Sequence, residues 1–135
     1  MFHLRKTILL AITAVIVGLA VTAGAQDEPD PIKPTRLHSP ALVRDYIGGE
    51  SHAVYVIRAK KGQTMTVIIQ PQKGETGAGF SVYRTRDVYE SEAAGFGKTS
   101  ADGRRFSGKV PVTRDYFIDI IAYPPSHFKL SVKLQ

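Results

Sequence analysis

The stretch that most constrains the fold covers residues 52–70, HAVYVIRAKKGQTMTVIIQ, in which two apolar runs flank a short polar segment. In residues 55–59 and 65–69, apolar side chains occupy every second position. A period of two is the pattern of a β-strand with one face toward a core. The stretch therefore predicts two strands joined into a β-hairpin through residues 60–63, KKGQ.

The same alternation recurs along the rest of the chain, and no segment beyond residue 25 has a helical period. This pattern is typical of an antiparallel sandwich or barrel. We favour an all-β antiparallel Greek-key sandwich of about seven or eight strands within residues 35–135. A second hairpin is predicted to join the last two strands. Besides the two strands above, we expect a short edge strand before Pro40, a weak strand near residues 95–98, and strands at residues 41–47, 80–83, 106–110, 115–123 and 128–134.

The segment DYFIDIIAY, residues 115–123, is apolar on both of its faces. Phe117, Ile121 and Tyr123 share the face opposite the one predicted to enter the core. We expect the long irregular loop of residues 84–103 to cover these three side chains. The alternative is an exposed apolar patch that contacts a partner.

The N-terminal residues 1–25 have the three parts of a secretory signal: a basic start, an apolar run at residues 8–21, and small residues at 23–25. Cleavage is expected after Ala25. A retained membrane anchor is disfavoured because the apolar run is short for a bilayer. Residues 26–34 then form a flexible acidic, proline-rich lead-in, and the mature chain, with no membrane span, is expected in the periplasm or outside the cell.

The chain has 18 basic and 12 acidic residues, and two of the basic residues would leave with the signal, so the mature chain is mildly basic. The charges alternate along the predicted strands instead of forming one run, which indicates a solvated sheet face and no nucleic-acid partner. No cysteine is present. This excludes disulfides, thiolate metal sites, a thiol nucleophile and a lipid anchor on cysteine.

The residues that could carry catalysis are sparse and scattered. His38, His52 and His127 lie in three separate segments, so we expect surface side chains and no metal site or cofactor. The chain lacks a nucleophile elbow and a phosphate-binding loop. It is therefore predicted not to be an enzyme. A small glycoside hydrolase remains a third hypothesis, with paired carboxylates drawn from Asp87, Glu90, Glu92 and Asp102.

A binding role is better supported than catalysis. Guanidinium and aromatic side chains, which are enriched at protein interfaces, occur at both borders of the long loop. We expect them to contact an acidic cleft on a partner protein. The candidate contact residues in this region are Arg84, Arg86, Tyr89, Arg104 and Arg105.

Two stretches carry a family resemblance: YVIRAKKGQTMTV at residues 55–67, and RFSGKVP followed by DYFIDI at residues 105–120. They resemble the periplasmic inhibitors of g-type lysozyme, a family that shares its sandwich with bacterial pre-peptidase C-terminal domains. The matching positions, Tyr55, Gly62, Gln63 and Tyr116, are structural signatures. Gly62 supplies backbone freedom in the turn, and Tyr116 resembles a tyrosine corner whose hydroxyl binds the preceding connection.

The resemblance implies an exported, non-catalytic protein that protects the cell envelope by occluding the cleft of a g-type lysozyme. Tyr123 and His127 are further candidate contact residues, because they lie in the final connection. This chain reads YPPSH there, at residues 123–127, where those inhibitors are rich in arginine. The alternative is an accessory module of the pre-peptidase C-terminal type, which would bind a glycan or a matrix protein.

Overall fold

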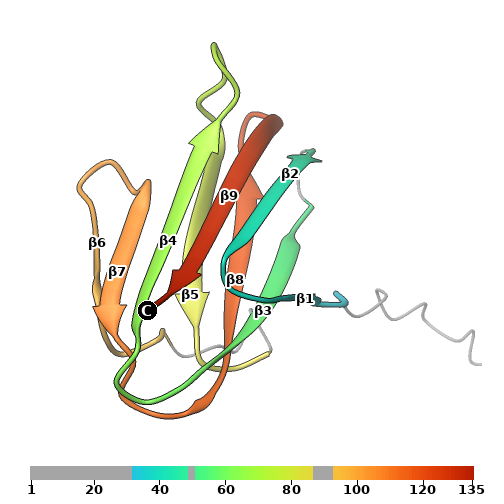
Figure 1. The fold of residues 1–135 in the computed structure, drawn as a ribbon. Helices are drawn as coiled ribbons and strands as arrows, with labels where there is room; N and C mark the ends of the chain where they lie inside the picture. The colour runs from blue at the N-terminus through green and yellow to red at the C-terminus, as the bar shows by residue number, and fades with distance from the viewer. Residues whose placement is uncertain (1–31, 49–50, 87–92) are drawn as a thin grey trace, which may run out of the picture. The chain divides into compact units, whose positions relative to one another are not determined.

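The computed structural model describes residues 32–48, 51–86 and 93–135, which belong to a compact unit spanning Pro31–Gln135. These ranges contain no helix, and so none that could cross a membrane. They form a four-stranded sheet in the order β1-β3-β8-β5 and a five-stranded sheet in the order β2-β9-β4-β7-β6 (Figure 1). The strands are β1 (Thr35–Leu37), β2 (Ala41–Ile47), β3 (Ala53–Ala59), β4 (Thr64–Pro71), β5 (Ala78–Tyr83), β6 (Lys98–Thr99), β7 (Arg105–Lys109), β8 (Arg114–Ala122) and β9 (Ser126–Leu134).

The predicted all-β antiparallel sandwich is confirmed. The described residues form nine strands, two of which, β1 and β6, are only three and two residues long. The weak strand expected near residues 95–98 is β6. Of the strand pairs in the described residues, only β1 with β3 is parallel.

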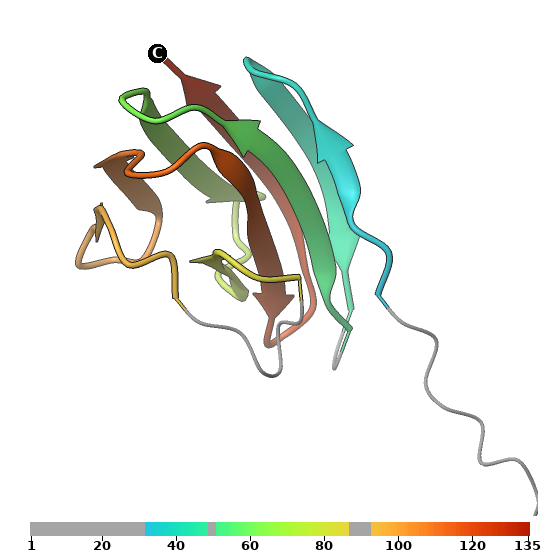
Figure 2. The ribbon, with the colours of Figure 1, turned by 90° about the horizontal axis from the view of Figure 1, so that it is seen from below.

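The predicted hairpin between β3 and β4 is wrong. β3 pairs with β1 and β8, whereas β4 pairs with β7 and β9, so the two strands belong to different sheets. Residues 60–63 form an arch between the layers (Figures 1 and 2). Alternation cannot separate the two cases, because it shows that one face of a strand is buried but not which strand lies beside it.

The predicted closing hairpin is wrong for the same reason. β8 lies in the four-stranded sheet and β9 in the five-stranded sheet. Among the described strands, only β6 and β7 follow one another within a single sheet. Every other connection crosses from one layer to the other, so nearly all strand pairs join segments distant in the sequence.

The core fills the space between the two sheets. Alternate residues of β3, β8, β4 and β9 meet there, which places the two apolar runs around the arch on opposite walls of one interior. The least exposed core side chains are Ile57, Ala59, Met65, Val67, Ile69, Val110, Tyr116, Ile118, Ile120, Leu130 and Val132.

Gly62 and Gln63 shape the arch between β3 and β4. Gly62 has a φ of 91°, which side chains rarely tolerate, and its N–H donates to Val110 O at 2.8 Å. The Gln63 Oε1 accepts from the Lys60 N–H at 2.8 Å. The predicted need for a glycine in this turn is confirmed.

The predicted tyrosine corner is also confirmed. The Tyr116 hydroxyl donates to Val112 O at 2.8 Å and so ties the β7–β8 connection to the core. Tyr55, the other aromatic signature residue, is buried with its hydroxyl 3.5 Å from Asp45 Oδ2. Burial, followed by the nearby Asp45 charge, raises the pKa of Tyr55 to about 12.

The outer face of β8 differs from its prediction. Phe117 is half-buried, but Ile121 is 51% exposed and Tyr123 is 92% exposed, so the prediction that the long loop covers them is wrong for these two.

On the same face, His52 Nδ1 lies 2.9 Å from Asp119 Oδ1. His52 is thus partly buried and not the surface side chain expected. Burial raises the pKa of the Asp119 carboxyl, and His52 opposes that shift.

Candidate functional site

One end of the sandwich gathers most of the candidate contact residues. Three connections form it: residues 72–77 between β4 and β5, residues 100–104 between β6 and β7, and residues 123–125 between β8 and β9. They lie together at the top of Figure 1. With the adjoining starts of β7 and β9, we call this surface the His127 end.

Glu75 organises the start of β9. Its carboxylate accepts hydrogen bonds from the His127 N–H and from the Ser126 hydroxyl, the latter at 3.2 Å, and lies 3.2 Å from His127 Nδ1. The hydrogen bond from the His127 N–H is the largest cause that lowers the pKa of Glu75. The buried Ser126 hydroxyl has a single proton, which it shares between Glu75 and His127 O, the latter 2.9 Å away. A charged carboxylate therefore fixes the backbone on which His127 is presented.

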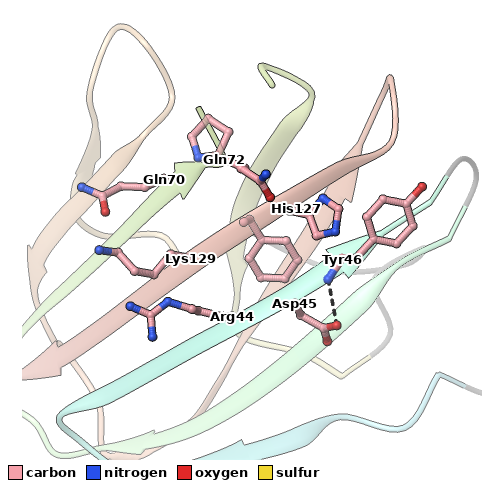
Figure 3. Close-up of a pocket in the computed structure, with 9 residues that line it drawn as sticks. Arg44, Asp45, Tyr46, Gln70, Gln72, His127 and Lys129 are labelled. Atoms are coloured by element: carbon pink, nitrogen blue, oxygen red, sulfur yellow. Dashed lines mark hydrogen bonds between the residues drawn. The ribbon is translucent and has the colours of Figure 1, made fainter. Parts of the chain in front are cut away.

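Tyr46 and His127 form the aromatic part of the site. They are register partners on β2 and β9, and their ring centroids lie 4.7 Å apart with an interplanar angle of 52°. Beside them, Arg44, Lys129 and Gln70 project from three neighbouring strands on the same side of the sheet (Figure 3). This open depression has a volume of about 500 Å³ and is lined by Arg44, Asp45, Tyr46, Gln70, Pro71, Gln72, His127, Phe128 and Lys129.

The β4–β5 connection links the parts of the His127 end. The Arg104 guanidinium donates to Thr76 O at 3.5 Å, and the Tyr123 N–H donates to Gly77 O at 3.0 Å. A Cβ at Gly77 would lie 1.9 Å from the carbonyl oxygen of Pro124, so only glycine fits there. Arg104, the β4–β5 connection and Tyr123 thus form a continuous rim.

The structure separates the predicted contact residues into two groups. Arg104, Arg105, Tyr123 and His127 lie at the His127 end. Arg84 and Arg86 follow Tyr83, which pairs with Phe117 near the opposite end of β8. The sequence suggested that the two arginine pairs come from one region, but the structure places them at opposite ends of the sandwich. Tyr89 lies outside the described residues.

Of the residues that line the depression, only His127 was predicted from the sequence, and Arg44, Tyr46 and Lys129 are among those missed. Each occupies an outward position in an alternating strand, which is where solvated side chains also occur. Their meeting depends on the pairing of β2 with β9, residues 41–47 with 126–132, and no sequence signal indicates that register. The alternation alone could have indicated only that Arg44 and Tyr46 share a face.

The basic residues are scattered along the sequence, but the fold brings several of them together on one solvated sheet face. Alternation places Arg44, Lys129 and Lys133 on the outer face of the five-stranded sheet, since the intervening residues of β2 and β9 face the core. Arg105 and Lys109 of β7 and Lys98 of β6 lie on the same face. Residues distant in the sequence thus form one cationic surface.

The chemistry of the His127 end is that of recognition. It offers guanidinium, ammonium, amide and aromatic groups, which bind carboxylates and apolar rings. In the part of the chain that the structure describes, no cluster of His, Asp and Glu could hold a metal ion. Of the carboxylates considered for hydrolysis, Asp102 accepts from Ser100 and from the Arg104 N–H. The Ser100 hydrogen bond is the largest cause lowering the pKa of Asp102. Asp87, Glu90 and Glu92 lie outside the described residues.

No protein-family model matches the chain, and no curated protein matches it either. Solved structures do. The Aeromonas hydrophila periplasmic inhibitor of g-type lysozyme superposes with a TM-score of 0.64 at 25% identity, over 77% of this chain and 97% of that one. The resemblance to these inhibitors is confirmed.

Two further matches below 25% identity show the fold alone. The pre-peptidase C-terminal domain of Bacillus anthracis collagenase has a TM-score of 0.58 at 17% identity, over 78% of this chain and 100% of that domain. The Salmonella Typhimurium inhibitor of g-type lysozyme has a TM-score of 0.55 at 15% identity, over 76% of this chain and 99% of that one.

Proposed function

We propose that the chain is an exported, non-catalytic binding protein that occludes the cleft of a g-type lysozyme with its His127 end. The observation that carries this proposal is the continuous rim of Arg104, the β4–β5 connection and the 92% exposed Tyr123. The likeness to an inhibitor at 25% identity supports the class of partner.

The rim has the chemistry that cleft binding requires. Glycoside-cleaving enzymes carry carboxylates in their clefts, and arginine binds carboxylates with two parallel hydrogen bonds. Tyrosine and arginine are the side chains most often found to dominate binding energy. Tyr123 would enter the cleft as an apolar anchor, while Arg105 would approach the acidic groups.

Packing and hydrogen bonds behind the rim hold its backbone in place and favour a rigid contact. Gly77 is packed against Pro124, and Glu75 fixes the start of β9 by hydrogen bonds to the backbone and side chains. A surface that is ordered before binding loses less conformational entropy in the complex.

An inhibition assay tests the proposal directly. The exported protein is titrated into a g-type lysozyme acting on peptidoglycan, and the residual rate is measured. The proposal expects stoichiometric loss of activity, and full lysozyme activity at excess protein would contradict it. Retention on peptidoglycan without inhibition would instead favour the accessory-module alternative.

A pair of double variants locates the contact. Tyr123→Ala with Arg105→Ala removes exposed groups of the His127 end and should weaken inhibition about 30-fold or more, the loss typical of a binding hot spot. The matched control, Val112→Ala with Arg86→Ala, removes exposed side chains at the opposite end and should leave inhibition unchanged. Equal losses in both double variants would refute the placement of the contact.

Export is part of the proposal and has its own test. Processing after Ala25 predicts a mature chain that begins at Gln26. N-terminal sequencing of the protein recovered from the periplasm or the medium checks this. A chain that keeps residues 1–25 would show that the segment acts as an anchor.

A further inference from the structure

The outer face of the five-stranded sheet carries six basic side chains from four of its strands. Its central strand, β4, presents Thr64, Thr66, Ile68 and Gln70 between them. Together the six define the basic face, and all but the half-buried Lys129 are exposed: Arg44, Lys98, Arg105, Lys109, Lys129 and Lys133.

No described acidic residue occupies an outward position of this sheet, although Asp45 lines the depression beside Arg44 and Lys129. Asp45 lies on β2, but its position alternates with the outward Arg44, and its carboxylate meets the inward Tyr55 hydroxyl. Glu75 and Asp102 lie in connections at the His127 end, where Ser126 and Ser100 donate to them.

The remaining described acids belong to the other sheet, where each contacts a basic or histidine side chain. Asp115 forms an ion pair with Arg36 at 3.0 Å and lies 3.7 Å from Arg58, and Asp119 pairs with His52. Within the described ranges no ion pair involves a member of the basic face. The two outer faces of the sandwich therefore differ sharply in electrostatic character.

The basic face spreads its charges in two dimensions. Neighbouring strands lie about 4.8 Å apart and residues four apart on a strand about 13 Å apart, so the cations span an area roughly 20 Å wide. A linear polyanion would need a single row of cations, whereas this spacing fits a planar array of negative charges. Leu42, 57% exposed, and Tyr46, 53% exposed, stand at the β2 edge of the face.

We propose that the basic face docks the protein on an anionic phospholipid bilayer. Cations near such a surface attract it over roughly a Debye length, and tyrosine is favoured at the boundary between headgroups and acyl chains. Leu42 and Tyr46 contact the headgroup region while the lysines bind lipid phosphates. This docking goes beyond lysozyme inhibition. It shares Arg105 with the proposed lysozyme contact but leaves Arg104 and Tyr123 of the rim free.

Vesicle co-sedimentation tests the docking. The exported protein is mixed with vesicles of phosphatidylcholine, with and without phosphatidylglycerol, at low and high salt. Binding is expected only to the anionic vesicles and should be lost at high salt. Equal binding to both vesicle types, or none to either, would overturn the proposal.

Matched triple variants separate the face from overall charge. Lys98→Gln, Lys109→Gln and Lys133→Gln together remove three cations that lie outside the candidate lysozyme contact. At about fivefold per cation, vesicle affinity should fall about 100-fold. The control removes the same charge from exposed lysines in connections, Lys60→Gln, Lys61→Gln and Lys73→Gln, and should change affinity little. Equal losses in the two triple variants would refute docking by this face.

Two further measurements complete the design. Thermal melting of both triple variants should match the wild type, because all six lysines are surface residues. Lysozyme inhibition by the Lys98, Lys109 and Lys133 variant should be unchanged, so a failure of docking is distinguishable from a failure of the inhibitor function. Retention on heparin without vesicle binding would assign the face to a soluble linear polyanion and overturn the bilayer proposal.

Discussion

Tyr116→Phe is the sharpest test of the scaffold. The Tyr116 side chain is 1% exposed, and its ring meets Phe96 edge to face with centroids 5.3 Å apart. Phenylalanine keeps this packing and removes only the hydroxyl that donates to Val112 O at 2.8 Å. One neutral hydrogen bond contributes about 1 kcal/mol net. The melting temperature of a domain of this size should therefore fall by about 4–8 °C.

Urea unfolding gives the measurement. The midpoint should fall while the slope with denaturant stays constant, because the surface exposed on unfolding is unchanged. Hydrogen exchange supplies a local readout. The Lys61 N–H donates to Thr113 Oγ1 at 2.9 Å, so loosening the β7–β8 connection should also speed exchange of the Lys61 amide.

A matched control uses the same chemical change on an exposed ring. Tyr123→Phe removes a hydroxyl from a side chain that is 92% exposed and should leave the midpoint unchanged. An unchanged midpoint for Tyr116→Phe, or equal losses for both variants, would refute the role assigned to the tyrosine corner.

Three further predictions follow from the geometry. Gly77→Ala should destabilise the fold by about 2 kcal/mol or more, because its Cβ would overlap a backbone carbonyl. Gly79→Ala places its Cβ in open space and should be neutral or slightly stabilising. Urea unfolding midpoints of the two variants measure the difference. The hydrogen bond from Arg36 lowers the pKa of Asp115 below its usual 3.8, so Asp115→Asn should destabilise at pH 7 by less than about 1 kcal/mol, and this difference should vanish as the pH falls below 3.8. In an alkaline absorbance titration, Tyr55 should ionise near pH 12, above the pKa of about 10 that is usual for tyrosine.

The sequence supported good predictions of the individual strands. Strands with clear alternation, such as residues 106–110 and 128–134, begin and end within two residues of the observed β7 and β9. Gly62 and Tyr116 were also predictable, because a positive φ and a tyrosine corner each depend on contacts close in the sequence.

The candidate site was predictable only in part. His127 and Tyr123 were identified through the family resemblance, whereas Tyr46 and Glu75 were not. Glu75 meets His127 across a separation of 52 residues, and Tyr46 meets it through strand pairing. Such contacts exist only once the chain has chosen its sheet partners.

The sequence by itself determined that this chain folds into strands with one buried face, because a period of two leaves no other structure that hides its apolar side chains. Tertiary structure decided which sheet each strand joins. The polar segment at residues 60–63 suits a hairpin or an arch, and packing of the two apolar faces against each other selects the arch. That same choice places β9 between β2 and β4, and so creates both the depression beside His127 and the basic face.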